Sequence, residues 1–600
     1  MCGLIGAFGR FNANGLLRGL DVMKARGPDA EGVWSEDGVW LGHRRLAILD
    51  LDRRADQPML SACGRYAIVF NGEIYNFRDL RGELESRGTS FRTTSDTEVL
   101  LELFRVHGEG MLPLLRGMFA FVIWDRRERC AFMARDPYGI KPLYFATAGE
   151  GLLTGSQVRA LIATGCVSRE PCVHGQASYW MLGSVREPYT WYRDIRALGA
   201  GQCAWFRPGQ SIRSSTWCDI GDAWRASQEN ERVDPRPLLR DRLTESVAAH
   251  MISDVPVGVF LSGGLDSAML AATMSRHARD AIQGVTLRYR EYDGRPQDET
   301  PAAAAMAASL GIRHTVRILE PPEFVADMPR IIASMDQPSI DGVNTWYASK
   351  VAAEQGLRVV VSGVGGDELL QGYASFRTLP RVLAGRRIAG AVPGLLPLVR
   401  RYGESRAKSS GKDRWRWVVD WTRTVAGAWW LSRSVRSPDE LEPIMGREAA
   451  DAALREFSPD AWVAEMAGPL PAREQLALSQ IESATYLRNQ LLRDTDWASM
   501  AHSVEVRTPL VDAALLFGLR AQLASFSHFT KKQLLSGALP RPLPPEVMNR
   551  PKTGFGIPVL GWWARSQGLP PAVADSRWWA VEVARLYGDV LTPRGDGGSD

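Results

Sequence analysis

The pattern of apolar and polar positions gives the first half of the chain the texture of short strands separated by turns. From residue 1 to about 215, apolar runs bounded by turn residues recur, for example at residues 66–70 and 119–124, and such runs are typical of β-strands. Helical periodicity occurs between them, at residues 79–86 and 96–106. This half is therefore predicted to combine strands with helices.

The second half alternates strands with helices after a polar segment at residues 219–234, which we interpret as a linker. The predicted elements are strands at residues 255–261, 282–289 and 357–362 and helices at residues 267–278 and 301–310. This alternation indicates a parallel sheet connected by crossover helices. Residues 380–540 are mostly helical in pattern, and the Gly- and Asp-rich end is expected to be a disordered tail. We therefore divide the chain into domains at residues 1–215 and 216–590, followed by a tail at 591–600.

Composition narrows the class of protein. A chain of 600 residues exceeds what one hydrophobic core supports, so two or more domains are expected. The net charge of +4 is small for this length and argues against a nucleic-acid partner. The seven cysteines are odd in number, scattered and without a CxxC pair, which argues against disulfides or zinc and for a reducing, cytoplasmic compartment. The sequence shows no signal-peptide pattern, and no apolar run approaches the roughly 18 residues of a transmembrane helix.

The first two residues carry candidate chemistry. Cys2 has a small side chain, so removal of Met1 is expected and would leave a thiol and an α-amine on the same residue. Such an amine titrates near neutral pH and can act as the general base for the thiol. Taken alone, an N-terminal cysteine is more often a small buried apolar residue, and the motifs that follow it decide between the two.

Four motifs follow Cys2 in order. They are Arg-Gly-Pro-Asp at residues 26–29, His-Arg-Arg-Leu-Ala-Ile at 43–48, Asn-Gly-Glu-Ile-Tyr-Asn at 71–76 and Ser-Asp-Thr-Glu at 95–98. With these motifs, the first 200 residues resemble the class-II glutamine amidotransferase domain, which has an N-terminal-nucleophile fold. The resemblance implies an α+β sandwich in which Cys2 attacks the glutamine carboxamide and releases ammonia.

The same resemblance assigns roles to five further residues. Asn71 and Gly72 would form the oxyanion hole, whose donors stabilise the charge that develops in the transition state. Arg45 would pair with the glutamine α-carboxylate, which suits a planar guanidinium with two parallel donors. Glu73 and Asp96 would hold the α-ammonium. The plainer alternatives are that Asn71 and Gly72 form a hairpin turn and that Arg45 and Asp96 are surface charges.

A second constellation, Ser-Gly-Gly-Leu-Asp-Ser, occupies residues 262–267 directly after the predicted strand at 255–261. A glycine turn that opens a helix presents backbone N–H groups and the positive end of the helix dipole to an anion. The Walker A spacing is absent. The hexapeptide resembles the pyrophosphate loop of enzymes that split ATP into AMP and pyrophosphate, and residues 362–368 are its expected companion.

This second resemblance implies ATP and Mg²⁺ as cofactors. Asp266 and Asp367 would coordinate Mg²⁺, which takes hard oxygen ligands and keeps phosphates and waters in its shell. The implied ATP-binding residues are Leu261, Ser262, Gly263, Gly264, Asp266, Ser267, Leu287, Ser362 and Gly363. The alternative is that Asp367 and Glu368 only cap the helix that follows them.

Residues 494–512 match an asparagine synthetase signature of the form D-x-x-SMAHS-x-E-x-R-x-P-x-x-D. Within it, Glu505, Arg507 and Asp512 either contact substrate or build a buried polar network, and the sequence does not separate these two readings. Residues 550–558 resemble the terminal R-x-K-x-GF segment of the same family.

Residues 530–535 resemble the K-x-L-L segment of that family. Lys532 is the register match for the catalytic lysine that steadies phosphate charge during adenylation, and Lys531 is the competing choice. A different segment, residues 414–430, carries five tryptophans among several arginines. A core-facing helix is the favoured reading of it, and a membrane-surface or partner contact is the alternative.

Two positions depart from the family pattern. The residue between the glycines of the SG-x-G segment is commonly acidic in asparagine synthetases and is Val364 here, which can neither accept a proton nor bind an ammonium. Gln157 stands where the family commonly carries glutamate, with an effect that the sequence leaves open. The first departure favours an acceptor acid other than aspartate.

The resemblance extends to about residue 560 and identifies the chain as a member of the asparagine synthetase family. It implies a glutamine-dependent ligase that adenylates a carboxylate with ATP and amidates it with ammonia. The expected small-molecule partners are glutamine, ATP and an acceptor acid, and a homodimer is compatible with the sequence. Three hypotheses remain open: asparagine formation, amidation of a larger acid such as a uronic, peptide or metabolite acid, and a scaffold that has lost synthetase turnover.

Overall fold

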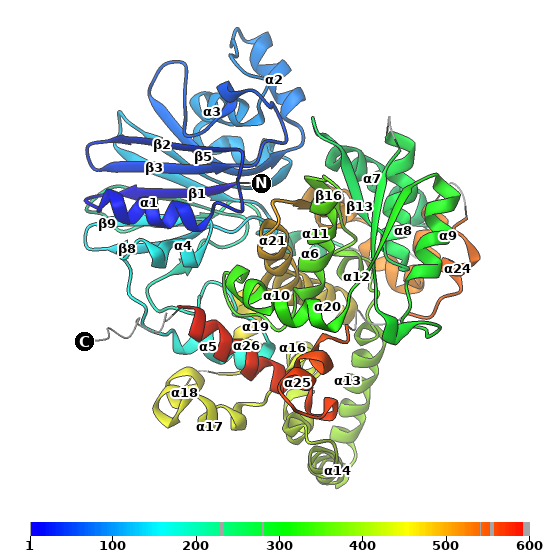
Figure 1. Cartoon of the computed structure of the whole chain (residues 1–600). Helices are drawn as coiled ribbons and strands as arrows, with labels where there is room; N and C mark the ends of the chain where they lie inside the picture. Colours follow the sequence, from blue (N-terminus) through cyan, green and yellow to red (C-terminus); the bar gives the residue numbers. More distant parts are fainter. Residues whose placement is uncertain are drawn as a thin grey trace.

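The computed structural model describes residues 2–227, 233–278, 281–455, 457–539, 542–552 and 557–591. The predicted tail at residues 591–600 falls almost entirely outside this part of the chain. Figure 1 shows two bodies side by side, an N-terminal one in blue and cyan and a C-terminal one in green to red. Among the described residues, no helix is both long and apolar enough to cross a membrane.

The N-terminal body is a sandwich of two six-stranded antiparallel sheets. Their strand orders are β10-β8-β9-β1-β3-β2 and β12-β11-β7-β6-β5-β4. The strands are β1 (Gly3–Phe8), β2 (Ala30–Glu36), β3 (Val39–Arg45), β4 (Met59–Leu60), β5 (Tyr66–Ile74), β6 (Gly117–Asp125), β7 (Cys130–Arg135), β8 (Tyr144–Ala148), β9 (Gly151–Gly155), β10 (Arg196–Ala197), β11 (Gln202–Phe206) and β12 (Arg213–Thr216). Leu4 and Phe8 of the first sheet share a buried cluster with Val69 and Val122 of the second, so the sheets pack face to face.

Helices cover both outer faces of this sandwich. They are α1 (Ala13–Val22), α2 (Phe77–Ser86), α3 (Asp96–His107) and α4 (Val158–Ala163). Helix α5 (Val173–Leu182) packs instead against helices of the C-terminal body. Leu16 and Leu20 of α1 pack with Ile5 of β1, and Leu100 of α3 packs with Phe70 of β5. The predicted α+β sandwich and its helices at 79–86 and 96–106 are confirmed. These helices form against the sheets because each must bury an apolar face.

The C-terminal body contains a five-stranded parallel sheet of order β15-β14-β13-β16-β17. Its strands are β13 (Val257–Phe260), β14 (Gln283–Arg288), β15 (Arg313–Ile318), β16 (Val359–Val361) and β17 (Glu505–Arg507). The flanking helices include α6 (Gly221–Arg225), α7 (Arg236–His250), α8 (Leu265–His277), α9 (Thr300–Leu310), α10 (Pro321–Ser334) and α11 (Val343–Glu354). The carboxyl ends of parallel strands lie on one edge of the sheet, where ligands of such folds bind.

The remainder of the chain is helical, as the pattern at 380–540 predicts. The helices are α12 (Gly366–Leu369), α13 (Ser375–Ala391), α14 (Leu395–Ser410), α15 (Val418–Trp421), α16 (Val425–Arg433), α17 (Glu442–Met445), α18 (Arg447–Leu454), α19 (Pro459–Ala467), α20 (Glu474–Glu482), α21 (Arg493–Met500), α22 (Ala513–Leu519), α23 (Lys531–Ala538), α24 (Pro545–Met548), α25 (Val559–Ser566) and α26 (Ser576–Leu591). Trp421, Trp429 and Trp430 are buried in their core, so the core reading of the tryptophan segment holds for these three. Trp415 and Trp417 remain partly exposed.

Candidate active sites

Cys2 lies immediately before β1 and faces β5 of the other sheet. Its backbone N–H donates to Oδ1 of Asn71 at 3.0 Å. The Nδ2 group of Asn71 is buried and has no hydrogen-bond partner among the described residues. An unused buried donor beside a nucleophile suits an oxyanion, because such donors stabilise charge most in a site that excludes water. Burial raises the pKa of the Cys2 thiol, so the thiol needs a base to become nucleophilic.

Asn71 and Gly72 lie within β5 and pair with Ala120 and Phe119 of β6, so the hairpin-turn alternative is wrong. A Cβ on Gly72 would come within 2.1 Å of the Met118 carbonyl oxygen. Only glycine therefore lets the two strands approach at this point.

Two buried carboxylates lie at the end of β5. Glu73 belongs to the strand, and Asp96 is the first residue of α3, with its Oδ2 accepting from the Ile74 N–H at 3.0 Å. Burial raises the pKa of Glu73 well above its usual range and that of Asp96 to about 6. A substrate ammonium would compensate this desolvated negative charge. The structure thus brings together the two residues predicted to hold the ammonium.

Arg45 is the last residue of β3 and is buried, as is Asp96. The alternative that these two residues are surface charges is therefore wrong. Nη1 of Arg45 donates to Asp56 Oδ1 at 2.7 Å and to the Asp52 carbonyl at 3.0 Å. Its Nη2 donates to the carbonyls of Leu49 and Asp50. A glutamine α-carboxylate at Arg45 would therefore have to replace contacts within the segment 49–56.

Arg26 is a site residue that sequence reasoning missed. Its Nε donates to the Cys2 carbonyl at 3.0 Å, and its two Nη groups donate to the Asp496 carboxylate at 2.7 and 3.1 Å. Both side chains are buried. This ion pair ties the backbone of the candidate nucleophile to α21 of the other body. The motif at 26–29 was visible in the sequence, but its partner lies 470 residues away.

The signature residues form a second buried link between the two bodies. Arg507 Nε donates to Glu505 at 2.6 Å, and an Arg507 Nη lies 3.5 Å from Glu73. Asp512 accepts from Arg116 of the N-terminal body at 3.0 Å. Of the two readings left open by the sequence, these contacts favour the polar network. The carbonyl of Arg507 also accepts from the Ser362 N–H at 2.8 Å, which connects this network to the predicted nucleotide segment.

The two glycine-rich segments meet at the carboxyl ends of β13 and β16. A Cβ on Gly363 would lie 2.9 Å from the Cβ of Asp266, and one on Gly366 would lie 2.4 Å from its Oδ1. The Ser267 hydroxyl lies 2.8 Å from that of Ser262 and closes the first loop. Glycines at these positions therefore bring the backbone of one segment against the carboxylate of the other.

Lys531 lies between the two predicted metal ligands. Its Nζ is 2.5 Å from Asp367 Oδ1 and forms an equally close ion pair with Asp266. Lys552 adds a second ammonium 2.8 Å from Asp367. Burial raises the pKa of Asp266, whereas Lys531 and Lys552 outweigh burial and lower the pKa of Asp367. Lys532, the residue that the sequence register favours, is exposed. Helix α23 begins at Lys531, and each residue turns a helix by about 100°, so the two lysines point in different directions. The structure therefore favours the competing choice.

The two aspartates fit a magnesium site. Oδ1 of Asp266 is buried and has no hydrogen-bond partner among the described residues, and both carboxylates converge on the position of one ammonium. Within the described ranges no cluster of three or more metal-ligating side chains occurs. Two carboxylates suffice for Mg²⁺, which completes its shell with phosphates and waters.

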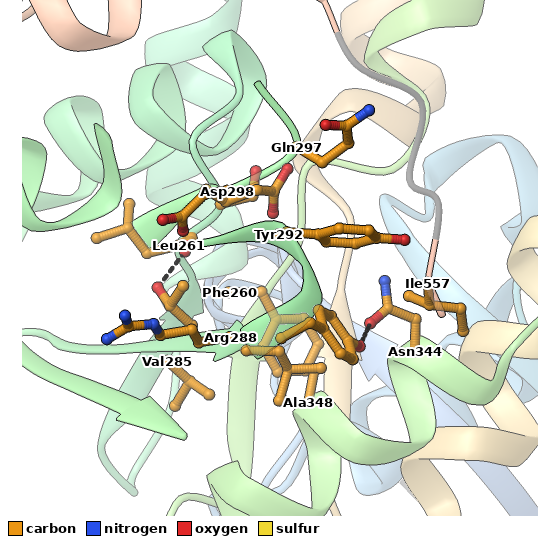
Figure 2. A pocket seen from close by; sticks show the side chains of 15 residues that line it. Phe260, Leu261, Val285, Arg288, Tyr292, Gln297, Asp298, Asn344, Ala348 and Ile557 are labelled. Atoms are coloured by element: carbon orange, nitrogen blue, oxygen red, sulfur yellow. Dashed lines mark hydrogen bonds between the residues drawn. The ribbon is translucent and has the colours of Figure 1, made fainter. Parts of the chain in front are cut away.

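A pocket opens beside this centre, between β13, β14 and α11 (Figure 2). The predicted residues Leu261, Ser262 and Leu287 line it together. Thr286 donates to the Leu261 carbonyl, and Tyr289 donates to Asn344 at 2.9 Å, so the walls are held by hydrogen bonds. Apolar walls with a few placed polar groups are typical of small-molecule pockets.

A second cavity of about 250 Å³ lies between the C-terminal helices and the segment at residues 182–186. It is lined by Leu182, Ser184, Arg186, Ile340, Asp341, Trp429, Arg433, Val435, Thr485, Tyr486, Asn489 and Gln490. Arg433 donates to Glu482 at 2.9 Å and lies 4.6 Å from the ring centre of Tyr373. Lys552 lies 5.0 Å from the same ring, so one aromatic side chain links the cavity wall to the lysine–aspartate centre. Sequence reasoning missed Arg433 and Glu482, because neither belongs to a motif.

Glu368 supplies a carboxylate near the position of Val364. It is buried, and the Tyr373 hydroxyl donates to it at 2.7 Å. Burial raises its pKa to about 7. Val364 packs against the apolar core. The acid–base groups of the segment 362–368 are therefore Asp367 and Glu368. Nothing in the structure explains Gln157, which precedes α4 without a side-chain cap.

The geometry thus joins a nucleophile site to a nucleotide site. Two protein families match the chain in the same order: the glutamine amidotransferase domain matches residues 1–217, and asparagine synthase matches residues 238–576. This pairing defines a carbon–nitrogen ligase that takes its nitrogen from glutamine.

Curated relatives agree with that class. A protein named putative asparagine synthetase [glutamine-hydrolyzing] from Mycobacterium tuberculosis is 32% identical over 98% of this chain and 93% of its own length. Asparagine synthetase [glutamine-hydrolyzing] 1 of Bacillus subtilis is 29% identical over 94% of this chain and 88% of its own length. The chain belongs to the glutamine-hydrolysing asparagine synthetase family, whose members use ATP. A solved allosteric regulatory enzyme of purine biosynthesis aligns at 18% identity and a TM-score of 0.30 over 63% of this chain and 77% of that one, too distant to inform the sites.

Proposed function

We propose that the chain amidates a carboxylic acid in two coupled half-reactions, with residues 1–215 as the glutaminase domain and 216–590 as the synthetase domain. In the first, the Cys2 thiolate attacks the glutamine carboxamide carbon, and Asn71 and Gly72 donate to the oxyanion. Loss of ammonia leaves a γ-glutamyl thioester, which water hydrolyses. The geometry that supports this step is the unused Asn71 Nδ2 donor beside the Cys2 N–H contact.

In the second half-reaction, the acceptor carboxylate attacks the α-phosphorus of ATP and pyrophosphate leaves. Ammonia then attacks the acyl-adenylate, and AMP leaves. Asp266 and Asp367 would hold Mg²⁺, which compensates phosphate charge when bound. Lys531 steadies the charge on the phosphates. The observation that carries this assignment is the convergence of both aspartates on Lys531 beside the glycine turns.

We further propose an acceptor larger than aspartate. Val364 removes an acidic group from the segment, and the 250 Å³ cavity adjoins the reaction centre through Tyr373. Its lining combines Trp429 and Tyr486 with Arg433 and Asp341, which suits an acid with an apolar body and polar substituents. Glu368 is the candidate base for the incoming amine, since its pKa lies near 7.

Asparagine formation is the second candidate, favoured by the names of the relatives. The two are separated by measuring AMP and amide formed from glutamine and ATP, with aspartate in one arm and uronic, peptide and metabolite acids in the other. A larger acid turned over faster than aspartate supports the proposal. Aspartate turnover at ordinary enzyme rates, about 1–10³ per second, would replace it with asparagine formation. All seven cysteines are free thiols, which supports a cytoplasmic location, and the homodimer stays a prediction.

A further inference from the structure

Helices α13 and α14 form a hairpin that extends away from the rest of the C-terminal body, with α14 at its outer end (Figure 1). We call residues 375–412 the basic hairpin. Helix α14 packs on the segment 413–421, α13 packs on α16 and α20, and the tip is the turn at residues 392–394. Neither candidate active site uses any residue of this hairpin.

The hairpin concentrates positive charge. Its basic residues are Arg377, Arg381, Arg386, Arg387, Arg400, Arg401, Arg406, Lys408 and Lys412. Its only acidic residue is Glu404, which gives a net charge of +8 in a chain whose total is +4, so the remaining residues together carry −4. Arg387 and Arg400 pair with Glu474 and Asp420 of the body, and most of the other charges have no ion-pair partner among the described residues. The net positive charge of this protein therefore comes from the basic hairpin.

The same hairpin exposes apolar side chains. Ile388 is 63% exposed, Val392 47%, Leu398 58% and Tyr402 63%. Leu398 and Tyr402 of α14 are four residues apart, and neighbours at this spacing share a helix face. Ile388 lies in the last turn of α13, and Val392 directly follows that helix. Of the 16 large apolar side chains that are exposed in the described part of the chain, five lie between residues 382 and 402. Ile388 and Leu398 thus lie four residues from the turn at 392–394, Val392 lies within it, and arginines flank them at residues 386–387 and 400–401.

We propose that the basic hairpin docks the protein onto a membrane surface that contains anionic lipids. Apolar side chains with arginines around them are the combination that interfacial helices use, since the apolar groups enter the acyl boundary and the cations meet the headgroups. Clusters of this many basic residues on a helix fit the negative potential of anionic lipids. The apolar groups lie on a hairpin that projects from the body, which suits insertion into a lipid layer better than the apolar core of a protein interface. No helix among the described residues crosses a membrane, so the docking is peripheral.

The test is co-sedimentation of the full chain with vesicles of neutral phosphatidylcholine and with vesicles that contain 30 mole per cent (about one lipid in three) phosphatidylglycerol, the anionic component. We expect binding to the anionic vesicles and at least tenfold weaker binding to the neutral ones. Binding should be lost at 1 M salt, where the Debye length is about one third of its value at 0.1 M. Absence of binding to anionic vesicles, or equal binding to both, overturns the proposal. Capture by immobilised polyglutamate without vesicle binding assigns the hairpin to an acidic protein partner and overturns it as well.

Two double variants locate the contact. Ile388→Ser with Leu398→Ser removes exposed apolar groups, and Arg381→Glu with Arg401→Glu reverses two exposed charges; each should weaken vesicle binding about tenfold or more. The matched control is Leu17→Ser with Val106→Ser, which changes exposed apolar groups of the N-terminal body. Glutamine hydrolysis, measured in all variants, reports that they fold. Unchanged binding in both hairpin variants, or an equal loss in the control, places the contact elsewhere and overturns the proposal.

Discussion

Replacing Asn71 by aspartate tests the oxyanion hole with almost no change in shape. The variant keeps Oδ1, which accepts from the Cys2 N–H at 3.0 Å, but replaces the buried Nδ2 donor with an oxygen. Removal of one oxyanion donor typically lowers kcat by about 10²–10³, equivalent to about 2.7–4 kcal/mol. The new oxygen also faces the developing negative charge, so we expect at least a 10²-fold loss, with little change in KM.

The assay is steady-state glutamine hydrolysis, which needs no acceptor acid. Asn12→Asp is the matched control, because Asn12 caps α1 at the surface through Oδ1 alone and aspartate caps equally well. Thermal unfolding of both variants reports whether the fold survives the buried substitution. A kcat for Asn71→Asp within tenfold of the wild type would refute the assignment of Nδ2 as an oxyanion donor.

Three further predictions follow from the two sites. Cys2→Ala should abolish glutamine hydrolysis and spare amidation from added ammonia; residual glutaminase activity, or a mature chain that still begins at Met1, would remove Cys2 from the mechanism. Lys531→Met should lower pyrophosphate release by at least 10²-fold and Lys532→Met by less than threefold, since electrostatic groups at phosphates are worth about 3 kcal/mol or more; the reverse order would restore the register favoured by sequence. The pKa of Asp96 is raised to about 6, so kcat/KM for glutamine should fall as pH decreases through about 6, because protonation removes the charge that holds the ammonium. Asp96→Asn should flatten this acidic limb of the pH profile, and an unchanged profile in the variant would assign the limb to another group.

Much of the fold could be predicted because its signals are local. The alternation of strands and helices after residue 255 and the apolar periodicity of α3 follow from which side chains each element must bury. The glycine turn at 262–267 was equally visible, because a strand, a turn and a helix are consecutive in sequence. In these segments each local preference agrees with the final structure.

The parts that escaped prediction depend on register or on distant contacts. One residue of register decides whether Lys531 or Lys532 faces the aspartates, and the capping of α23 by Thr530 sets that register. The pairing of Arg26 with Asp496 joins positions 470 residues apart, which no periodicity reveals. The cavity at Arg433 likewise arises from packing among several helices, none of which carries a motif.

In the proposed mechanism, one chain transfers glutamine nitrogen to a carboxylate through an acyl-adenylate. The most direct test is incubation with amide-¹⁵N glutamine, ATP and Mg²⁺ in the presence of the acceptor panel, followed by mass spectrometry of acids and nucleotides. We expect a ¹⁵N-amide formed in equal amount to AMP and pyrophosphate, and no amide with Cys2→Ala unless ammonia is supplied. ADP as the nucleotide product, or amide formation without AMP, would contradict this mechanism.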